Sequence, residues 1–380
     1  MRKKSDIQLK TFKGSHKEMG AQQGRACVDI IKHSHSMLAT SPELRAIKPF
    51  FLPIGLFLKL AKMKMWGDFA AGIKKDSPCQ HARLEGIAEG AGENMKHMIF
   101  LQSMEIEMAK THFIGGACSA AAVAADRSAS GEPIIIKNFD YPEFFSPTHL
   151  VRMDVPSDGY RILAATNAPL AGSHDSINEH GLSITYNYGY GQDASSNSVP
   201  MTMALQDTLE KCKTTAEAIE FLRKCKYNGC ALWMICDAQG DLRSVEISKT
   251  MVDERKPKEG VIAHTNHYLT ERLAKVDVPP SAVYSRTNVP ALRGKRCRES
   301  SEVRLARLEE LLSKQQKFSE EDLIRFFSDH GADGIGSDNT VCRHSDYFCT
   351  TLSVILYPAS KKFKVLYGHP CEYEYAEFSF

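Results

Sequence analysis

A cysteine and an aspartate lie at the ends of two apolar stretches that a turn separates. Cys118 opens a run of small apolar residues typical of a buried strand, and a second apolar strand, residues 134–136, leads into Asp140. The turn residues at 128–133 favour a hairpin, which would return Asp140 to the neighbourhood of Cys118. A thiol beside a carboxylate can act as a nucleophile. This pair is therefore the first candidate for a catalytic site.

Asparagine residues lie near the ends of later strands. Asn178 precedes a glycine turn and a strand, and Asn266 ends a strand within the sequence His264-Thr265-Asn266-His267. Amide side chains and backbone N–H groups in such places can donate hydrogen bonds to a developing oxyanion. A thiol, a base and such donors are the groups that cysteine acylation needs.

Each candidate also has an ordinary structural explanation. Cys118 could be a small buried apolar residue, because free cysteines are among the most buried side chains. Asp140 could cap the turn after it, and Asn178 could simply form a hairpin turn. Arg304 lies on an expected helix with other charged residues, where a solvated salt-bridge face is usual. Local sequence leaves these alternatives open.

Two patterns of secondary structure surround Cys118. Residues 7–110 have mostly helical periodicity, and Ser15 with Glu18 forms a capping box at the first helix. From Cys118 onward, strands alternate with pairs of helices in an order that favours an α+β fold of antiparallel sheets covered by helix layers. The expected strands are 120–124, 134–137, 150–154, 161–166, 182–187, 231–236, 242–247, 261–265, 350–357 and 363–367, and the expected helices are 201–212, 214–225, 302–312 and 319–328.

Among these strands, residues 231–236 and 242–247 form the clearest hairpin, with a turn at 238–241. The strand at 261–265 is expected to extend this hairpin.

Composition and charge narrow the classes of function. The chain of 380 residues has 48 basic and 46 acidic side chains, which argues against a nucleic-acid partner. The most apolar stretch, 49–65, is interrupted by Pro53 and three lysines, so we expect a packed helix or a lid over an apolar pocket and no membrane span. No apolar segment follows the basic N-terminus, so we expect no secretory signal and a cytoplasmic protein.

The cysteines indicate a reducing environment. There are 11 of them, scattered along the chain and without a Cys-x-x-Cys pair. This pattern fits an intracellular protein and argues against a zinc knuckle.

Two stretches near the C-terminus contain residue types that could do chemistry. Residues 329–338 contain aspartates and His330, which suggest cation ligands, but they lack the spacing and the terminal glutamate of a calcium loop. Cys342 and His344 form an i,i+2 pair that could meet on one face of a strand and mimic a Cys–His dyad. We interpret both stretches as structural and expect neither a metal nor a cofactor.

Eight short motifs occur in an order that is typical of one enzyme family. They are Gly14-Ser15-His16-Lys17-Glu18-Met19-Gly20, Cys118-Ser119-Ala120, Asn138-Phe139-Asp140, Asn178-Glu179-His180-Gly181-Leu182, His264-Thr265-Asn266-His267, Ser301-Glu302-Val303-Arg304, Cys342-Arg343-His344 and Cys371-Glu372-Tyr373-Glu374-Tyr375. Over essentially its whole length the chain resembles cysteine N-terminal-nucleophile (Ntn) hydrolases of the acyl-coenzyme A:isopenicillin-N (6-aminopenicillanate) acyltransferase type, relatives of the choloylglycine hydrolases. One such motif alone is weak evidence for the resemblance, whereas eight motifs in the family's order are specific evidence.

The resemblance implies a four-layer αββα sandwich and a precursor that cuts itself between Ala117 and Cys118. Residues 1–117 would become a helical α-subunit, and residues 118–380 would form the catalytic domain. The Cys118 thiol would attack the Ala117 carbonyl, and water would then release the N-terminal segment. The new α-amine would deprotonate the thiol of the same residue, which would supply both nucleophile and base.

The resemblance also implies roles for four further residues. Asp140 would hold the α-amine, and Asn266 would donate its side-chain amide to the oxyanion. Asn178 would contribute its backbone N–H to the same oxyanion hole. Arg304 would anchor the polar network around Cys118.

Lys137, Asn138 and His264 are further candidates, as residues that support the catalytic groups. Lys137 stands where choloylglycine hydrolases have arginine, which argues against bile-acid-like specificity. Ala117 stands where the family commonly has glycine. This difference would slow self-cleavage, because glycine reaches strained backbone conformations more freely.

Three hypotheses about function remain. The first is an autoprocessing amidohydrolase or acyltransferase that passes the acyl group of a small amide or thioester through Cys118 to water or an amine. The second is a non-catalytic binding module that retains the fold. The third, ranked last, is a metal-dependent hydrolase that uses His264 and His267. The substrate and the existence of a homo-oligomer stay open.

Overall fold

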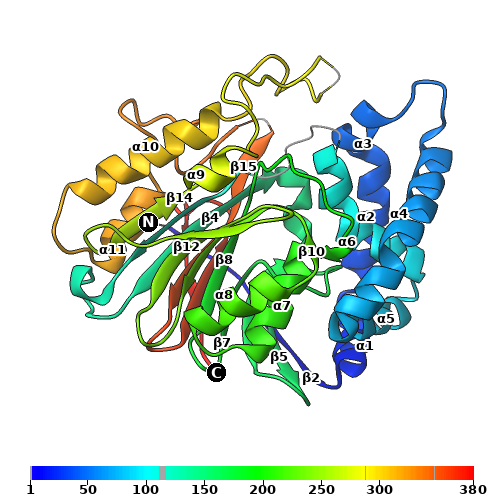
Figure 1. Ribbon diagram of the computed structural model, residues 1–380, viewed down its shortest axis with the longest axis horizontal. Helices are drawn as coiled ribbons and strands as arrows, with labels where there is room; N and C mark the ends of the chain where they lie inside the picture. Colours follow the sequence, from blue (N-terminus) through cyan, green and yellow to red (C-terminus); the bar gives the residue numbers. More distant parts are fainter. Residues whose placement is uncertain (1, 111–116, 287, 346) are drawn as a thin grey trace.

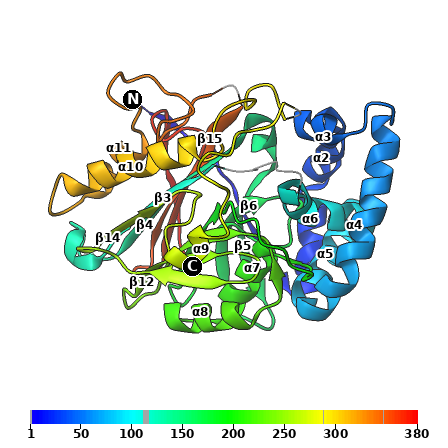
Figure 2. The same ribbon diagram turned by 45° about the horizontal axis from the view of Figure 1, so that its top comes forward.

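The computed structural model describes residues 2–110, 117–286, 288–345 and 347–380. Two β-sheets lie face to face, and helices cover the outer face of each sheet (Figure 1, Figure 2). One apolar cluster lies between the sheets, and two others lie between a sheet and its helices. These layers confirm the predicted αββα sandwich. Gly115 and Gly116, which precede Ala117 in the sequence, lie outside the described residues.

The six-stranded sheet contains the start of the candidate site. Its order is β14 (Val261–His264), β3 (Ser119–Val123), β4 (Ile134–Pro142), β15 (Phe348–Tyr357), β16 (Lys362–Tyr367) and β18 (Ala376–Phe378). β3 and β4 form the predicted hairpin, with Ser119 opposite Asn138. β4 continues beyond the expected end at residue 137, so Asp140 lies within the strand.

The eight-stranded sheet has the order β13 (Val252–Arg255), β12 (Leu242–Ile247), β11 (Ala231–Cys236), β8 (Ser183–Tyr188), β7 (Asp175–Asn178), β6 (Ile162–Asn167), β5 (His149–Pro156) and β2 (Leu9–Gly14). The predicted β11–β12 hairpin is confirmed. The prediction that residues 261–265 extend it is wrong, because β13 takes that place and β14 pairs with β3. Ile262 packs between the sheets and Ala263 under the helices of the six-stranded sheet, so β14 is buried on both faces there.

The N-terminal segment belongs to the same sandwich. It contains β1 (Lys3–Lys4), β2, α1 (His16–Ala26), α2 (Val28–Thr40), α3 (Pro42–Ile47), α4 (Ile54–Asp76), α5 (Pro78–Ala91) and α6 (Met95–Lys110). The predicted helical character holds except at β2, which pairs in parallel with β5. The capping box of Ser15 and Glu18 is present.

Helices α1 and α5 approach each other closely because glycines face the backbone of the partner helix. A Cβ atom added to Gly20 would lie 2.0 Å from the Arg83 carbonyl oxygen, and one added to Gly86 would lie 2.0 Å from that of Lys17. Larger residues would therefore force the helices apart. Gly20 belongs to the first of the eight motifs, and this close packing explains why the position requires a glycine.

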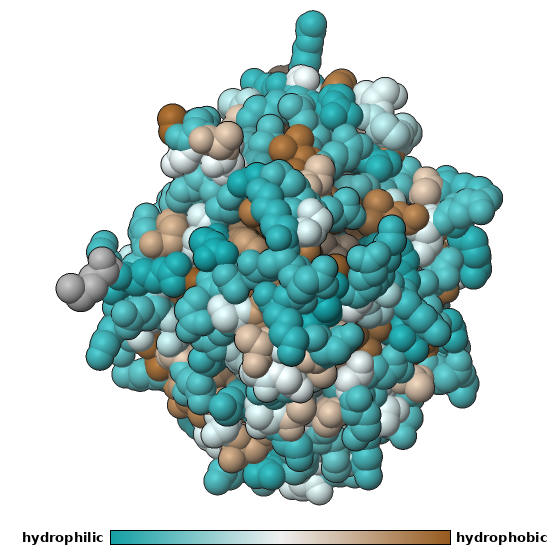
Figure 3. Space-filling model, turned by 90° about the vertical axis from the view of Figure 1, so that its left-hand side faces the viewer, coloured by the Kyte–Doolittle hydropathy of each residue, from teal (hydrophilic) through white to brown (hydrophobic). Residues whose placement is uncertain are grey.

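The later helices complete the two outer layers. They are α7 (Met201–Lys211), α8 (Thr215–Lys224), α9 (Glu271–Ala274), α10 (Glu299–Ser313) and α11 (Glu320–Phe327). α7 and α8 join the N-terminal helices, while α10 and α11 cover the six-stranded sheet. The face viewed in Figure 3 is mainly hydrophilic, with apolar side chains in small scattered groups. Among the residues that the structure describes, no helix combines the length and the apolar character needed to cross a bilayer.

Candidate active site

Cys118 lies immediately before β3, and its side chain is 2% exposed. The thiol belongs to the apolar cluster between the sheets and also lines a cavity of about 90 Å³. Burial raises the pKa of the Cys118 thiol to about 11, although the charge of Lys137 acts in the opposite direction. The thiol is therefore protonated at neutral pH and needs a base before it can act as a nucleophile.

Arg304 connects the segments around Cys118. Its Nη1 donates to the Cys118 carbonyl oxygen and to Ser119 Oγ, both at 2.7 Å, and its Nη2 donates to Asn266 Oδ1 at 3.0 Å. The guanidinium is fully buried under α10. The alternative of a solvated salt-bridge face is therefore wrong for Arg304. It applies to Arg307, which pairs with Glu310 at 2.7 Å and is partly exposed.

Asn266 presents an amide N–H in this network. Because a guanidinium only donates, the contact with Arg304 identifies the amide oxygen and fixes the direction of Nδ2. Nδ2 donates to the Tyr188 carbonyl oxygen at 2.9 Å and has a second hydrogen available. The backbone is held by Ser301 Oγ, which accepts from the Asn266 N–H at 3.0 Å. Asn266 therefore remains a candidate oxyanion donor.

Asp140 brings a buried carboxylate to the backbone of the candidate cleavage site. Its Oδ1 accepts a hydrogen bond from Thr350 Oγ1 at 2.7 Å, and its carbonyl oxygen accepts from the Ala117 N–H at 3.3 Å. Its Oδ2 is buried, accepts no hydrogen bond from any described residue and lies 3.9 Å from Arg304 Nη1. Burial raises the pKa of Asp140 to about 6, although Arg343 and Arg304 oppose the shift. An incompletely paired carboxylate of this kind can hold a cation or accept a proton.

Arg343 is a residue to which sequence reasoning assigned no role. Its Nη1 donates to the Ala117 carbonyl oxygen at 3.4 Å, and its Nη2 donates to Asp338 Oδ1 at 2.7 Å. The guanidinium is buried and lies over the Phe348 ring, 5.1 Å from its centroid. The sequence feature that could have identified it is the motif Cys342-Arg343-His344, in which Arg343 had no role assigned.

Asn178 does not join this site. Its backbone N–H donates to the Leu182 carbonyl oxygen at 3.0 Å. Its Nδ2 donates to the carbonyl oxygens of Leu209 and Cys212 at 2.9 and 2.8 Å, which ties the β7–β8 turn to the end of α7. The prediction that its backbone N–H serves an oxyanion is wrong, because that group is already bonded within the turn.

Asn187 is the asparagine of this region that lies beside the site. It sits on β8 between Tyr186 and Tyr188, which line the same cavity as Cys118. Its Nδ2 donates to the Thr265 carbonyl oxygen at 2.9 Å, immediately before Asn266. Sequence reasoning chose the turn at the start of this strand, although the end of the same strand also carries an asparagine.

Two of the residues expected to support the catalytic groups, Lys137 and Asn138, lie on opposite faces of β4. Lys137 is buried between the sheets, and its Nζ donates to both carboxylate oxygens of Asp175, at 2.7 and 2.9 Å. Asn138 faces the helices, where Nδ2 donates to the carbonyl oxygens of residues 327 and 341. Of these two, only Lys137 acts electrostatically on Cys118.

His264 and His267 do not form a metal site. His264 Nδ1 lies 2.8 Å from Ser244 Oγ, whereas His267 Nδ1 lies 2.7 Å from Ser301 Oγ. Neither histidine belongs to a group of potential metal ligands within the described ranges. The metal-dependent hypothesis therefore lacks the site on which it depended.

Ala117 is buried beside Cys118. The Ala117 side chain packs in an apolar cluster with Tyr188 and Tyr190. The expectation that alanine at this position slows self-cleavage stays a prediction.

The cavity beside Cys118 has an apolar and aromatic wall with one carboxyl group. It is lined by Ser34, Met37, Leu38, Leu101, Gln102, Met104, Glu105, Cys118, Phe139, Tyr141, Phe145, Thr148, Asn167, Pro169, Leu170, His174, Tyr186, Tyr188 and Thr202. Burial raises the pKa of Glu105 to about 7, although a hydrogen bond with Tyr186 acts to lower it. No residue of 49–65 lines this cavity. Residues 54–65 begin α4 and pack on the core through Leu58 and Met65, so the expected packed helix is confirmed.

Comparison with known proteins identifies the family. The family model described as "Acyl-coenzyme A:6-aminopenicillanic acid acyl-transferase" matches residues 127–371, well over half of the chain, beginning after Cys118. No curated protein sequence shows significant similarity.

Three solved structures show a more distant likeness. A mutant of the conjugated bile acid hydrolase from Clostridium perfringens is 14% identical, with 69% of this chain and 97% of that chain covered and a TM-score of 0.39. The Caenorhabditis elegans ortholog of N-acylethanolamine-hydrolyzing acid amidase is 13% identical (63% and 93% covered, TM-score 0.42), as is penicillin V acylase from Agrobacterium tumefaciens (65% and 82% covered, TM-score 0.40). The family model alone carries the assignment: the chain belongs to the acyl-coenzyme A:6-aminopenicillanic acid acyl-transferase family.

Proposed function

We propose that the protein cuts itself between Ala117 and Cys118 and then transfers the acyl group of a small amide or thioester through Cys118. The observation that carries this proposal is the incompletely paired carboxylate of Asp140 beside the Ala117–Cys118 backbone. A new α-amine on Cys118 would supply the hydrogen-bond donor that Asp140 Oδ2 lacks. The two arginines on the carbonyl groups of Ala117 and Cys118 support the same proposal.

Self-cleavage uses the groups around the peptide bond. The Cys118 sulfur attacks the Ala117 carbonyl carbon, and Arg343 faces the oxygen that becomes negative. The thiol proton passes by way of Asp140 to the Cys118 nitrogen, which leaves as an amine. This step exchanges an amide bond for a thioester. Water then hydrolyses the thioester, which frees the thiol and the carboxylate of Ala117.

In the cut enzyme, the α-amine of Cys118 is the base. Asp140 holds it and tunes its proton affinity, so the amine can accept the thiol proton that burial otherwise retains. Asn266 Nδ2 donates to the oxyanion that forms when the thiolate attacks the substrate carbonyl. The protonated amine then gives its proton to the leaving group, and water or an amine resolves the acyl-enzyme.

The N-terminal fragment remains part of the enzyme after cleavage. β2 pairs with β5 along its whole length, and Leu38, Leu101 and Glu105 of this fragment line the cavity beside Cys118. A fragment that is paired in the sheet and forms the cavity wall is a subunit, so the cut protein is a heterodimer.

Buried charges strengthen this attachment. Arg83 Nη2 donates to Asp154 Oδ1 and Gln23 Oε1 at 2.7 and 2.8 Å, and Arg152 Nε donates to Asp154 Oδ2 at 3.0 Å. All four side chains are fully buried. Separation of the fragments would leave buried charges without partners, which is costly.

The cavity favours an apolar or aromatic acyl group. We propose amide hydrolysis as the basic reaction, because water is a sufficient acceptor. Transfer to an amine needs an acceptor site in addition, and the acyl transfer named in the family description is compatible with either outcome.

Intact mass spectrometry of the purified protein tests the proposal. Chains of 1–117 and 118–380 are expected, and Cys118→Ala should give a single chain. Cys236→Ala, which changes another fully buried cysteine, is the matched control and should still be cut. A panel of aliphatic and aryl-acyl amides then tests turnover. An uncut protein whose Cys118 fails to react with electrophilic probes would support the non-catalytic binding module instead.

A further inference from the structure

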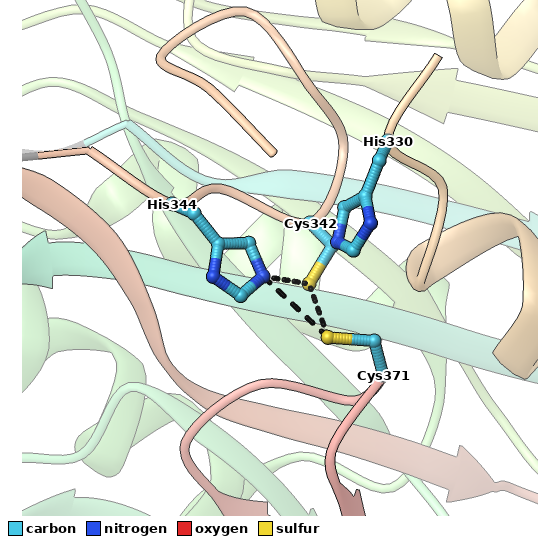
Figure 4. Close-up of side chains that lie close together, drawn as sticks. All are labelled: His330, Cys342, His344 and Cys371. Carbon is cyan, nitrogen blue, oxygen red and sulfur yellow. Dashed lines mark hydrogen bonds between the residues drawn. The ribbon is translucent and has the colours of Figure 1, made fainter. Parts of the chain in front are cut away.

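Four metal-binding side chains converge near the C-terminal end of the chain, outside the cavity beside Cys118. His330 follows α11, Cys342 and His344 precede β15, and Cys371 follows β16. One ligand atom of each lies within 4.8 Å of all the others, and Figure 4 shows the four side chains pointing toward one another. Three separate stretches of chain therefore meet at one point.

The separations of three of the ligand atoms match tetrahedral coordination. Cys342 Sγ and Cys371 Sγ are 3.7 Å apart, and His344 Nε2 lies 3.5 Å from each sulfur (Figure 4). A zinc ion about 2.3 Å from sulfur and about 2.0–2.1 Å from nitrogen, with tetrahedral angles, sets these separations at about 3.8 and about 3.5 Å. We propose that His330, Cys342, His344 and Cys371 bind one Zn²⁺ ion.

The donor set distinguishes zinc from other common ions. Two sulfur and two imidazole ligands in tetrahedral order are typical of zinc, whereas magnesium and calcium prefer oxygen ligands. All four positions come from the protein, which is the arrangement of structural zinc sites. His330 Nε2 is buried and has no hydrogen-bond partner among the described residues, which leaves a polar atom that the four residues alone do not satisfy.

The surrounding loop holds the ligands in place. A Cβ atom added to Gly336 would lie 2.5 Å from His344 Cδ2, so only glycine allows the imidazole its present position. On the opposite face, the His369 ring stacks on His344 with centroids 3.8 Å apart and planes 10° apart. His344 is therefore confined between neighbours before any ion binds.

The segment before His330 is also fixed. Arg307 Nε and Nη2 donate to the two Asp329 carboxylate oxygens at 2.9 and 2.7 Å. The Asp329 carbonyl oxygen accepts from the Cys342 N–H at 3.1 Å. These bonds join the stretches that carry His330 and Cys342, so the site is organised by the fold.

The ion has a consequence for the active site, and this part rests on the proposed function. Cys342 and His344 flank Arg343, whose guanidinium bonds to the Ala117 carbonyl. Zinc on both neighbours would hold the backbone of Arg343 and so keep its side chain at the bond to be cut. In this role the zinc positions Arg343 and takes no part in the chemistry.

Metal analysis of the full chain tests the site directly. The protein is purified in reducing buffer without chelators or a histidine tag, and zinc is measured by mass spectrometry. About one zinc per chain is expected. Cys371→Ser should lose the zinc, whereas Cys225→Ser, a partly buried cysteine outside the cluster, should retain it. The same measurements on Cys118→Ala keep the test independent of self-cleavage.

Cobalt substitution identifies the ligands. Co²⁺ should give thiolate-to-metal charge-transfer absorption and tetrahedral d–d bands, and His330→Ala should alter both if Cys371→Ser fails to fold. A folded protein that binds neither zinc nor cobalt would overturn the proposal. So would zinc retained by Cys371→Ser, or a Cys342–Cys371 disulfide in the protein isolated under reducing conditions.

Discussion

The ionisation of Asp140 yields a quantitative test of the arrangement around Cys118. Burial raises the pKa of this carboxyl from 3.8 to about 6 in the uncut chain, in spite of Arg343 and Arg304. The folded state therefore binds the proton more tightly than the unfolded state. By linkage, the contribution of Asp140 to the free energy of unfolding is most favourable below about pH 4 and is lost as the pH rises to about 6.

The size of this effect follows from the pKa difference. A difference of about two units, at 1.36 kcal/mol per unit, corresponds to about 3 kcal/mol. Asp140→Asn removes the titration. The free energy of unfolding of the asparagine variant, relative to the parent protein, should therefore rise by about 3 kcal/mol in total from about pH 3 to about pH 7, of which about 2 kcal/mol falls between pH 4 and pH 6.

The measurement is urea denaturation across this pH range in a Cys118→Ala background, in which no self-cleavage occurs. All other groups titrate in both proteins and cancel in the difference. The asparagine amide adds an offset that does not depend on pH, so only the slope is interpreted. Asp126→Asn, at an exposed carboxyl group, is the control and should give a flat difference.

A flat difference for Asp140→Asn would refute the reasoning, because it would show that this carboxylate is already compensated in the uncut chain. A slope of opposite sign would mean that Arg304 and Arg343 overcompensate it. Either result would remove the physical reason for a new α-amine to bind there.

Other variants test other parts of the site. Arg343→Gln should slow the appearance of the 118–380 fragment about 10²-fold, the lower end for an oxyanion donor because its 3.4 Å bond is long; a time course of intact mass measures this, and an unchanged rate would contradict it. Asn266→Ala should lower kcat of the cut enzyme by about 10²–10³-fold in steady-state assays, and a normal kcat would exclude its amide as the donor. Asp154→Ala should destabilise the protein by about 3–5 kcal/mol and separate the two cut chains at lower urea on size-exclusion chromatography; co-elution at the parental urea concentration would show that the buried charges are unimportant. KM for an apolar amide should rise as the pH passes about 7, where Glu105 ionises in the cavity, and Glu105→Gln should abolish the rise; a rise that persists would assign it to another group.

Local patterns of sequence predict the hairpin that creates the site. Short-range alternation and turn residues specify β3 and β4, and their antiparallel register brings Asp140 to the backbone of Ala117. The resemblance to the family further predicts Asn266 and Arg304, which do meet at Cys118. The αββα layers follow for a similar reason, because strands with two apolar faces must be covered on both sides.

Contacts between distant segments depend on tertiary packing. β14 has the pattern of a strand in either sheet, and only the packing of Ile262 between the sheets selects the partner β3. Asn178 precedes β8 and Asn187 lies near its end, and which of them reaches the site depends on how that strand crosses the second sheet.

Arg343 and the proposed zinc site show most clearly that local sequence does not predict contacts between distant segments. Arg343 lies far along the chain from Ala117, and no local pattern indicates that its side chain meets the Ala117 carbonyl. The four proposed zinc ligands come from three stretches, and Cys342 with His344 is the one close pair among them. Residue types and local spacing thus indicated the candidate nucleophile, the carboxylate near it and the fold class. The fold alone decided which distant donors surround the bond before Cys118, because those contacts depend on how separate strands and loops pack together.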